Sequence, residues 1–321
     1  MAGAGAPRAL FFGTPDFALE GLRALCEVAD VVLVVTQPDR PAGRGMKLTP
    51  PPVKELALER GIEVAQPKGI RKPEFAARLR ALEADVAIVI AYGRILPPGV
   101  LTAPRLGCLN VHASLLPKLR GAAPIQWSII SGEARSGVCL MQMDEGLDTG
   151  AVLACESTDI GENETAGELS ARLSQLGGKL VREQLPRFLR GELRAEPQDH
   201  ARHTLAPLLD KEQGRMDFTK SAAQLHALVR GTHPWPGAFC FFNGQRVKVH
   251  RTQVLVPDGA QGASGTVLRA DRSAIDVACG QGVLSLLELQ PEGKKRMVAE
   301  QFRAGARIAA GQRFTSTESA P

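Results

Sequence analysis

Three polar side chains in the first half of the chain are of the types that act together on a carbonyl group. Asn110 and His112 lie two positions apart in a short apolar run, and Asp148 lies in a glycine-rich stretch farther along. Because side chains alternate along a strand, Asn110 and His112 are expected on one face and their apolar neighbours on the other. A carboxylate orients an imidazole and favours its protonated form, while an amide donates to an oxygen that becomes negative. These residue types therefore predict attack on a carbonyl carbon.

The surrounding sequence narrows this chemistry. No serine or cysteine stands in a G-x-S-x-G arrangement, so we expect direct attack by an external nucleophile without a covalent intermediate. No metal is expected, because H-x-x-x-H and clustered Cys/His spacings are absent and His200-x-x-His203 falls in an expected linker. Each residue alone also has a structural interpretation: a histidine near a strand end is often only hydrogen-bonded, and Asp148 between Gly146 and Gly150 suits a turn.

The run that contains His112 leads directly into a stiff connection. Ser114–Pro117 and Arg120–Pro124 each end in proline, which disfavours helix before it, and Gly121 permits a tight turn. We therefore expect a pocket wall made of backbone beside His112.

Apolar runs of strand length recur through the first half of the chain and predict a mostly parallel, Rossmann-like α/β sheet. The expected strands are Arg8–Phe12, Val31–Val35, Val86–Ile90, the run ending at His112, Ser136–Met143 and a last strand, Ala151–Ile160, that could pair antiparallel. The turn after the first strand predicts Thr14 as an N-cap and has a single glycine, so the dinucleotide fingerprint is absent. Ligands of such sheets bind beyond the carboxyl ends of the strands, where Asn110, His112 and Asp148 would converge.

The second half of the sequence changes character. A capping box, Thr165-x-x-Glu168, opens a long helix, and the polar stretch 191–209 suits a linker. A helix over Ser221–Arg230 and a series of short strands then predict a small OB-like β-barrel. Those strands are Ala238–Phe242, Gln245–Gln253, Gly265–Arg269, Ala274–Ala278 and Val283–Gln290. We expect a catalytic domain over 1–190, a linker over 191–209 and a barrel over 210–315, with a frayed tail after Arg313.

Positive charge is concentrated in the second half of the chain. Residues 1–210 carry 24 Lys/Arg against 25 Asp/Glu, whereas residues 211–321 carry 15 against 9. Such an appendage suits a polyanionic partner such as RNA, although a merely soluble basic domain has the same composition. The loop Thr36–Pro52, too rich in Pro and Gly for regular structure, lies in a basic region without acidic residues between Arg40 and Lys54. We expect this loop to order around a negatively charged partner, the alternative being a solvated surface excursion.

Chain length and cysteine spacing indicate the number of domains and the cellular compartment. A chain of 321 residues exceeds what one core usually supports, so two domains are expected. The 6 cysteines form no CxxC pair, which predicts neither a disulfide framework nor zinc and fits a reducing cytosol. No apolar run is long enough for a membrane helix, and the opening residues lack the apolar region of a signal peptide. We therefore expect a cytoplasmic protein without membrane contact.

Several segments, in the same order, resemble the methionyl-tRNA formyltransferase family. They are Phe12–Phe17, Thr36–Gly45, Ala91–Gly93, Asn110–Pro117, Arg120–Ile125, Met141–Asp144, Gly146–Gly150, Pro234–Pro236 and Leu289–Lys295. The likeness spans roughly residues 9 to 315. The Asn-x-His pattern with a distant Asp is shared by folate-dependent formyltransferases in general and indicates only the chemistry. The basic loop and the barrel are more specific to the tRNA enzymes.

The resemblance implies 10-formyltetrahydrofolate as formyl donor and the α-amine of initiator methionyl-tRNA as acceptor. We also expect a monomer. The resemblance further implies that Asn110 stabilises the oxyanion, that His112 shuttles the proton and that Asp148 orients and charges His112. The implied folate-lining residues are Tyr92, Gly93, Ile95, Leu96, Ser114, Leu115, Leu116 and Pro117. The implied tRNA contacts are Arg40, Arg44, Lys47, Arg246, Lys248, Lys294 and Lys295.

Lys118-Leu119 departs from the family pattern, because many members carry Arg followed by an aromatic there. The chemistry is unaffected, but local contacts around the pocket are expected to differ. Three other functions stay open: a sibling formyltransferase acting on a nucleotide or nucleotide sugar, a formyltetrahydrofolate hydrolase, and a non-catalytic RNA-binding protein. Labelled formyl transfer, with and without charged tRNA, separates them.

Overall fold

The structure divides into two compact units. The computed structural model describes residues 5–42, 47–256, 258–259 and 262–318. The first unit comprises Met1–Pro124, Arg135–Asp159 and Ser170–Pro207, and the second comprises Ile125–Ala134, Ile160–Leu169 and Leu208–Pro321.

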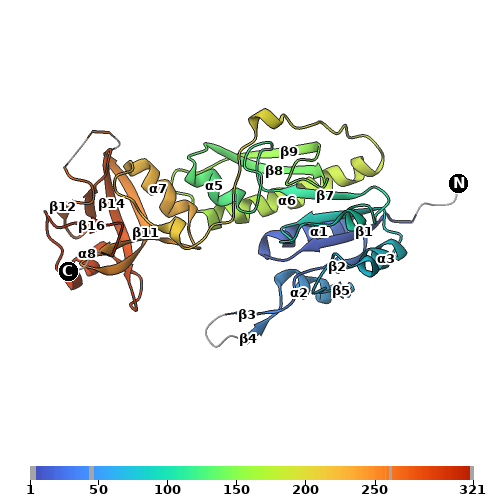
Figure 1. Ribbon diagram of the computed structural model, residues 1–321, viewed down its shortest axis with the longest axis horizontal. Coiled ribbons are helices and arrows are strands. Elements are labelled where there is room, and N and C mark those ends of the chain that lie inside the picture. Colours follow the sequence, from blue (N-terminus) through green and yellow to red (C-terminus); the bar gives the residue numbers. More distant parts are fainter. Residues whose placement is uncertain (1–4, 43–46, 257, 260–261, 319–321) are drawn as a thin grey trace. The chain divides into compact units, whose positions relative to one another are not determined.

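A seven-stranded sheet forms the centre of the first unit (Figure 1). The strand order is β5-β2-β1-β6-β7-β8-β9, parallel as far as β7 and antiparallel from β7 to β9. The strands are β1 (Arg8–Gly13), β2 (Asp30–Val35), β5 (Val64–Ala65), β6 (Val86–Ile90), β7 (Cys108–His112), β8 (Arg135–Gln142) and β9 (Val152–Asp159). The mostly parallel α/β class is confirmed, as is the antiparallel last strand.

Helices cover both faces of this sheet, and the alternation of side chains along β7 decides which residues meet which helices. The helices are α1 (Leu19–Val28), α2 (Pro52–Glu59), α3 (Pro73–Ala81), α4 (Pro98–Leu101) and α6 (Ala166–Leu189). Cys108 packs in one core with residues of α3 and α4. Val111 points to the other face, where a Cβ on Gly177 of α6 would stand 3.2 Å from its Cγ1. Asn110 and His112 therefore continue the Cys108 face toward the carboxyl end of the strand.

The second unit is a curled antiparallel sheet. The strand order is β12-β13-β14-β11-β10-β16, and β15 pairs with β14. The strands are β10 (Ala238–Phe242), β11 (Gln245–Val256), β12 (Val267–Ala270), β13 (Ile275–Ala278), β14 (Val283–Pro291), β15 (Met297–Val298) and β16 (Phe314–Thr315). A bridge between Thr266 and Arg313 joins the two ends of this order, so the sheet closes on itself. The small β-barrel expected from the sequence is confirmed.

The second unit also contains helices. Helix α7 (Ala222–Gly231) begins at a capping box between Ser221 and Gln224, while α5 (Pro124–Ile130) and α8 (Ala299–Ala306) were not expected from the sequence. The tail is not frayed immediately after Arg313, because Phe314 is buried and pairs with β10. None of the helices among the described residues combines the length and apolar character that a membrane crossing requires.

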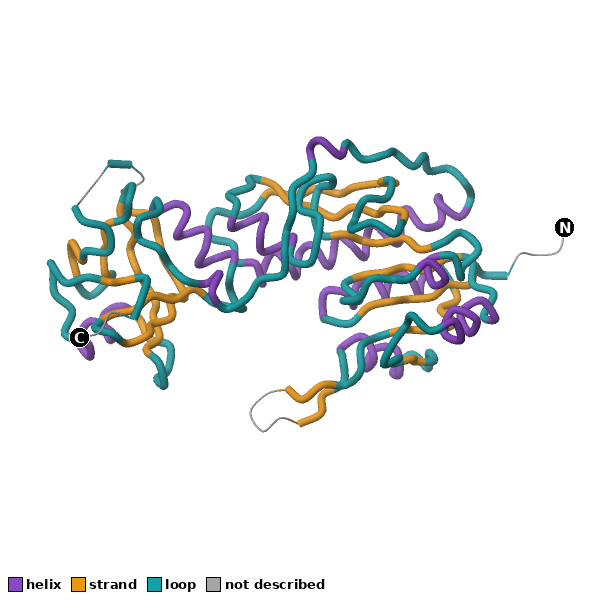
Figure 2. Tube along the Cα trace, viewed as in Figure 1, coloured by secondary structure: helices purple, strands orange, loops and turns teal. Residues whose placement is uncertain are grey.

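Two local expectations in the first unit are wrong. Thr14 does not cap a helix: its hydroxyl donates to the Tyr92 carbonyl at 3.1 Å, and Pro15 precedes the 3-10 helix η1 (Asp16–Ala18). The loop 36–52 is not wholly irregular, because β3 (Arg40–Ala42) and β4 (Lys47–Thr49) form an antiparallel pair that extends from the sheet (Figure 2). Pro41 is tolerated there because a two-stranded ribbon leaves alternate N–H groups unpaired.

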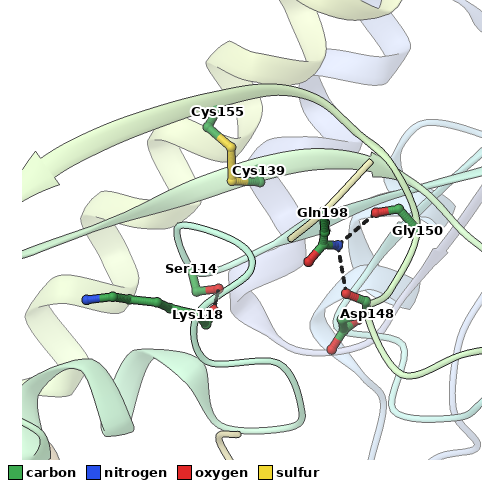
Figure 3. Close-up of a disulfide and its surroundings, with 7 residues drawn as sticks. All are labelled: Ser114, Lys118, Cys139, Asp148, Gly150, Cys155 and Gln198. Carbon is green, nitrogen blue, oxygen red and sulfur yellow. Dashed lines mark hydrogen bonds between the residues drawn. A yellow bond between two sulfur atoms is a disulfide. The ribbon is translucent and has the colours of Figure 1, made fainter. Parts of the chain in front are cut away.

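The cysteine spacing predicted no disulfide framework, but one pair of cysteines is joined. Cys139 and Cys155 form a disulfide (Figure 3). They are 16 residues apart in sequence, but the antiparallel pairing of β8 and β9 places them directly opposite each other. The spacing alone carries no such signal, because the register of the strands creates the contact.

Candidate active site

The three residues singled out by their chemistry converge at the edge of the first unit's sheet. Asp148 Oδ1 lies 3.5 Å from Asn110 Nδ2, and Asp148 Oδ2 lies 3.6 Å from His112 Nδ1. The side chains of His112 and Asp148 are 6% and 15% exposed, so water screens this cluster only weakly. One carboxylate therefore faces both an amide donor and an imidazole.

The imidazole has one committed nitrogen and one available nitrogen. His112 Nε2 lies 3.0 Å from the Leu119 carbonyl oxygen. A carbonyl oxygen only accepts, so Nε2 carries a proton and donates it to this bond. Nδ1 faces Asp148 and is not held by this bond.

The loop after β8 presents Asp148 through its own hydrogen bonds. Asp144 Oδ1 accepts from Gly146 N at 3.0 Å and from Thr149 Oγ1 at 2.7 Å. A Cβ on Gly150 would stand 1.8 Å from the Gln142 carbonyl oxygen, so only glycine allows this approach. Asp144, Gly146, Thr149 and Gly150 therefore build the turn, which leaves the carboxylate of Asp148 for the site.

The connection after β7 supplies backbone groups, as its prolines and glycine predict. Leu119 provides the carbonyl that orients His112, and Gly121 N donates to Asp148 Oδ2 at 2.8 Å. Gly121 has φ +122, and a Cβ there would stand 2.7 Å from the Ala206 carbonyl oxygen. This position therefore requires glycine both for its conformation and for the close approach of another segment.

Sequence reasoning missed Gln198, which lies in the segment expected to be a linker. Its amide nitrogen donates to the carbonyl oxygens of Asp148 and Gly150, at 2.9 and 2.7 Å (Figure 3). Gln198 is itself bonded to Arg120, and both are buried. A single glutamine between two prolines carries no sequence signal for such a role, because the contact spans 50 residues.

The residues expected to line a folate site fall in two loops. Ser114 Oγ donates to the Lys118 carbonyl at 2.7 Å, so its hydroxyl closes the loop Ser114–Lys118. Leu115, Leu116 and Pro117 are half-buried in the same loop. In the loop after β6, Tyr92 and Leu96 are buried, whereas Gly93 and Ile95 are exposed.

Buried polar atoms without partners gather beside the second of these loops. Among the described residues, Thr36 Oγ1, Gln37 Oε1 and the Tyr92 hydroxyl have no hydrogen bond. Gln37 Nε2 donates to the Tyr92 carbonyl at 3.1 Å, which places Gln37 at the start of the loop. Burial raises the pKa of Tyr92, so its phenol stays protonated and remains a donor. Such atoms suit a ligand rich in donors and acceptors.

No nucleophilic cysteine on β7 competes with this interpretation. Burial raises the pKa of the Cys108 thiol to about 12, so it is not a thiolate at neutral pH. Among the described residues, no group of His, Cys, Asp or Glu has an arrangement that holds a metal ion.

The basic residues expected to meet RNA lie in both units. Arg40 and Lys47 are exposed on the β3–β4 pair, and Arg44 lies outside the described residues. In the second unit, Arg246 and Lys248 line a cavity of about 210 Å³ together with the end of β14. Arg246 stacks over the Phe239 ring at 3.7 Å, and the exposed Lys294 and Lys295 follow in the turn after β14.

Comparison with known proteins agrees with this fold. A model of the formyl transferase family matches residues 9–185, and the model of its C-terminal domain matches residues 208–307. A sugar 3N-formyl transferase, WlaRD, solved in the presence of dTDP and 5-N-formyl-THF, has the same fold. The match covers 91% of this chain and 100% of the WlaRD chain, with a TM-score of 0.65 and 15% sequence identity. The chain thus matches both the formyl transferase model and the model of its C-terminal domain.

Close relatives define the family more narrowly. Methionyl-tRNA formyltransferase of Myxococcus xanthus is 53% identical over 95% of this chain and 97% of its own length. The enzyme of that name from Sorangium cellulosum is 52% identical over 95% of this chain and 98% of its own length. The chain belongs to the methionyl-tRNA formyltransferase family.

Proposed function

We propose that this chain transfers the formyl group of 10-formyltetrahydrofolate to the α-amine of initiator methionyl-tRNA. The observation that carries the proposal is the convergence of Asn110 and His112 on Asp148, at 3.5 and 3.6 Å, in a chain that belongs to this family. An amide donor, an imidazole and a carboxylate suit acyl transfer to an external amine.

Each residue has one role in the reaction. When the amine attacks the formyl carbon, Asn110 Nδ2 donates to the oxygen that becomes negative. His112 moves a proton at Nδ1, from the attacking amine toward the departing folate nitrogen, while Leu119 holds Nε2. Asp148, whose carboxylate faces Nδ1 at 3.6 Å, stabilises the imidazolium. The amine loses one proton and the folate nitrogen gains one, so the reaction needs no added acid or base.

The donor is proposed to lie between the loops that hold Tyr92, Gly93, Ile95 and Leu96 and Ser114–Pro117. The unpartnered atoms of Thr36, Gln37 and Tyr92 support this placement, because the pterin part of a folate carries many donors and acceptors. Arg40 and Lys47 from the first unit, together with Arg246, Lys248, Lys294 and Lys295 from the second, are proposed to contact phosphates of the tRNA.

The wider organisation is proposed on the same basis. We propose a catalytic domain over 1–190, a linker over 191–209 and a tRNA-binding barrel over 210–315. The enzyme is proposed to act as a monomer in the cytoplasm, where charged tRNA is found.

Labelled formyl transfer tests the proposal. The enzyme is incubated with formyl-labelled folate and either charged initiator tRNA, a nucleotide amino sugar or no acceptor. Label on methionyl-tRNA alone is expected. Label on the sugar would indicate a sibling transferase, formate released without acceptor would indicate a hydrolase, and binding of tRNA without transfer would indicate an RNA-binding protein.

A further inference from the structure

Asp148 has a left-handed backbone conformation. Its φ is +53°, in a region that residues other than glycine adopt less often, although aspartate tolerates it better than most. The conformation turns the carboxylate toward Gly121 N, Asn110 and His112, and it turns the carbonyl oxygen of Asp148 away from them toward Gln198. Whatever binds that carbonyl therefore helps to decide where the carboxylate stands.

Both hydrogens of the Gln198 amide are used on this turn. The nitrogen donates to the carbonyls of Asp148 and Gly150, which flank Thr149, at 2.9 and 2.7 Å. Two bonds from one amide fix the separation of these carbonyls and hence the curvature of the turn between them. Gln198 is 8% exposed, so water competes poorly for either bond.

Arg120 fixes which way the Gln198 amide points. Gln198 Oε1 accepts from Arg120 Nε and Nη2, at 3.1 and 2.7 Å. A guanidinium has no acceptor, so the amide oxygen must face Arg120 and the amide nitrogen must face the turn. Arg120 is 4% exposed and lies between Leu119 and Gly121, the residues whose backbone contacts His112 and Asp148.

The segment that carries Gln198 is held at both ends by backbone hydrogen bonds. Glu196 exchanges bonds with Val152 at the start of β9, at 2.8 and 2.9 Å. Thr204 and Ala206 bond to the backbone of Arg120, at 2.9 and 2.7 Å. Gln198 is therefore placed by a segment whose backbone is hydrogen-bonded on both sides of it.

We infer that Gln198, oriented by Arg120, is a positioning residue that holds the Asp148 turn in its catalytic conformation. This inference rests on the proposed role of Asp148 and adds the residues through which that role is maintained. Gln198 does not touch the reacting atoms: it acts only through the carbonyls of Asp148 and Gly150.

Two substitutions at Gln198 remove its hydrogen bonds to the Asp148 turn, one with and one without an acceptor for Arg120. Gln198→Glu keeps an acceptor for Arg120 but has no hydrogens for the two carbonyls, whereas Gln198→Leu removes both sets of bonds. We expect each variant to lower kcat by about 10- to 100-fold, because a small misplacement of a catalytic group has effects of this size. The KM values for folate and for charged tRNA should stay within about twofold. Gln184→Leu, which removes an amide that accepts from Arg187 on α6, is the matched control and should have unchanged kcat.

A double-mutant cycle with Asp148→Asn completes the test. If Gln198 acts through Asp148, Gln198→Glu should lower the residual kcat of Asp148→Asn by less than about threefold. A full 10- to 100-fold loss in that background, or wild-type kcat in the Gln198→Glu variant, would overturn the inference. Wild-type kcat in Asp148→Asn alone would instead refute the proposed role of Asp148, and the positioning role would fall with it.

Discussion

The edge of the sheet in the first unit and the cavity beside Arg246 in the second present polar groups in opposite ways. Asn110 and His112 are buried, and backbone groups of Leu119 and Gly121 fix the orientation of the site. By contrast, Lys248 is exposed on β11, and Lys294 and Lys295 are exposed in a turn.

The difference follows from what each region is proposed to bind. A transition state has its charges at particular points, so donors must stand at those points before the reaction begins. A nucleic acid backbone carries many equivalent charges, so long and mobile side chains are sufficient. Single substitutions should therefore have large effects in the first region and small, additive effects in the second.

The largest effect is expected for His112→Ala. Removing the group that moves the proton should lower kcat by about 10²- to 10⁴-fold, the usual contribution of acid–base catalysis. Steady-state formyl transfer measures the loss, and His233→Ala in the second unit is the control. A loss of less than about tenfold would place the proton transfer elsewhere.

Gly121→Ala tests the backbone part of the same region. A Cβ at φ +122 would stand 2.7 Å from the Ala206 carbonyl oxygen, so the segment that carries Gln198 must move. We expect kcat to fall by about 10²-fold and the free energy of unfolding by about 1 to 3 kcal/mol.

Gly191→Ala is a matched control for this variant. Gly191 also has a left-handed backbone, with φ +73, but nothing lies within 4 Å of its Cβ position. Because its φ is also positive, Gly191→Ala should lower the free energy of unfolding as Gly121→Ala does, but it should retain full kcat. Equal loss of activity in the two variants would show that the close approach at Gly121 is unimportant.

Substitutions of the exposed lysines in the second unit should change the affinity for tRNA but not the rate of formyl transfer. Changing Lys248, Lys294 and Lys295 to Gln should weaken tRNA binding and reduce the slope of log affinity against log salt by about 1 for each phosphate that is no longer neutralised. The single-turnover rate at saturating tRNA should be unchanged. Lys211→Gln and Lys220→Gln, also exposed in this unit, form the control. An unaltered salt slope in the triple variant would contradict the proposed phosphate contacts.

The smallest effect concerns the stability of the second unit at low pH. Burial lowers the pKa of His226 below its ordinary value of 6.5, with a further contribution from Arg230. The unfolded chain therefore takes up a proton before the folded one does, and stability falls as the pH drops through 6.5 toward the folded pKa. Thermal melts between pH 7.5 and 5 should show this decrease. His226→Gln should reduce this decrease in stability. If the variant and the wild type have the same pH dependence, the decrease arises from other groups.

Patterns that depend on local spacing were sufficient for most of the fold. The apolar runs predicted the strands of the sheet and the alternation that places Asn110 and His112 on one face, which the structure has. The capping box at Thr165 is also present, since Thr165 N donates to Glu168 Oε2 at 2.8 Å and Glu168 N donates to Thr165 Oγ1 at 3.3 Å. Spacing also indicated that a glycine-rich turn carries Asp148.

What the sequence did not predict depends on register and on distant contacts. The Cys139–Cys155 disulfide arises from the pairing of β8 with β9, and Phe314 is buried because it completes the barrel against β10. Gln198 gains its hydrogen bonds only when the segment around it returns to Arg120. No local pattern in the chain encodes these meetings.

Single-turnover formyl transfer by Asn110→Ala, with tRNA affinity measured in parallel, tests the central claim most directly. Loss of one donor to the developing oxyanion should slow the chemical step by about 10²- to 10³-fold and leave the affinity for charged tRNA unchanged. A rate near that of the wild type, or a loss of affinity as large as the loss of rate, would contradict the assignment of Asn110, His112 and Asp148 to the reacting carbonyl.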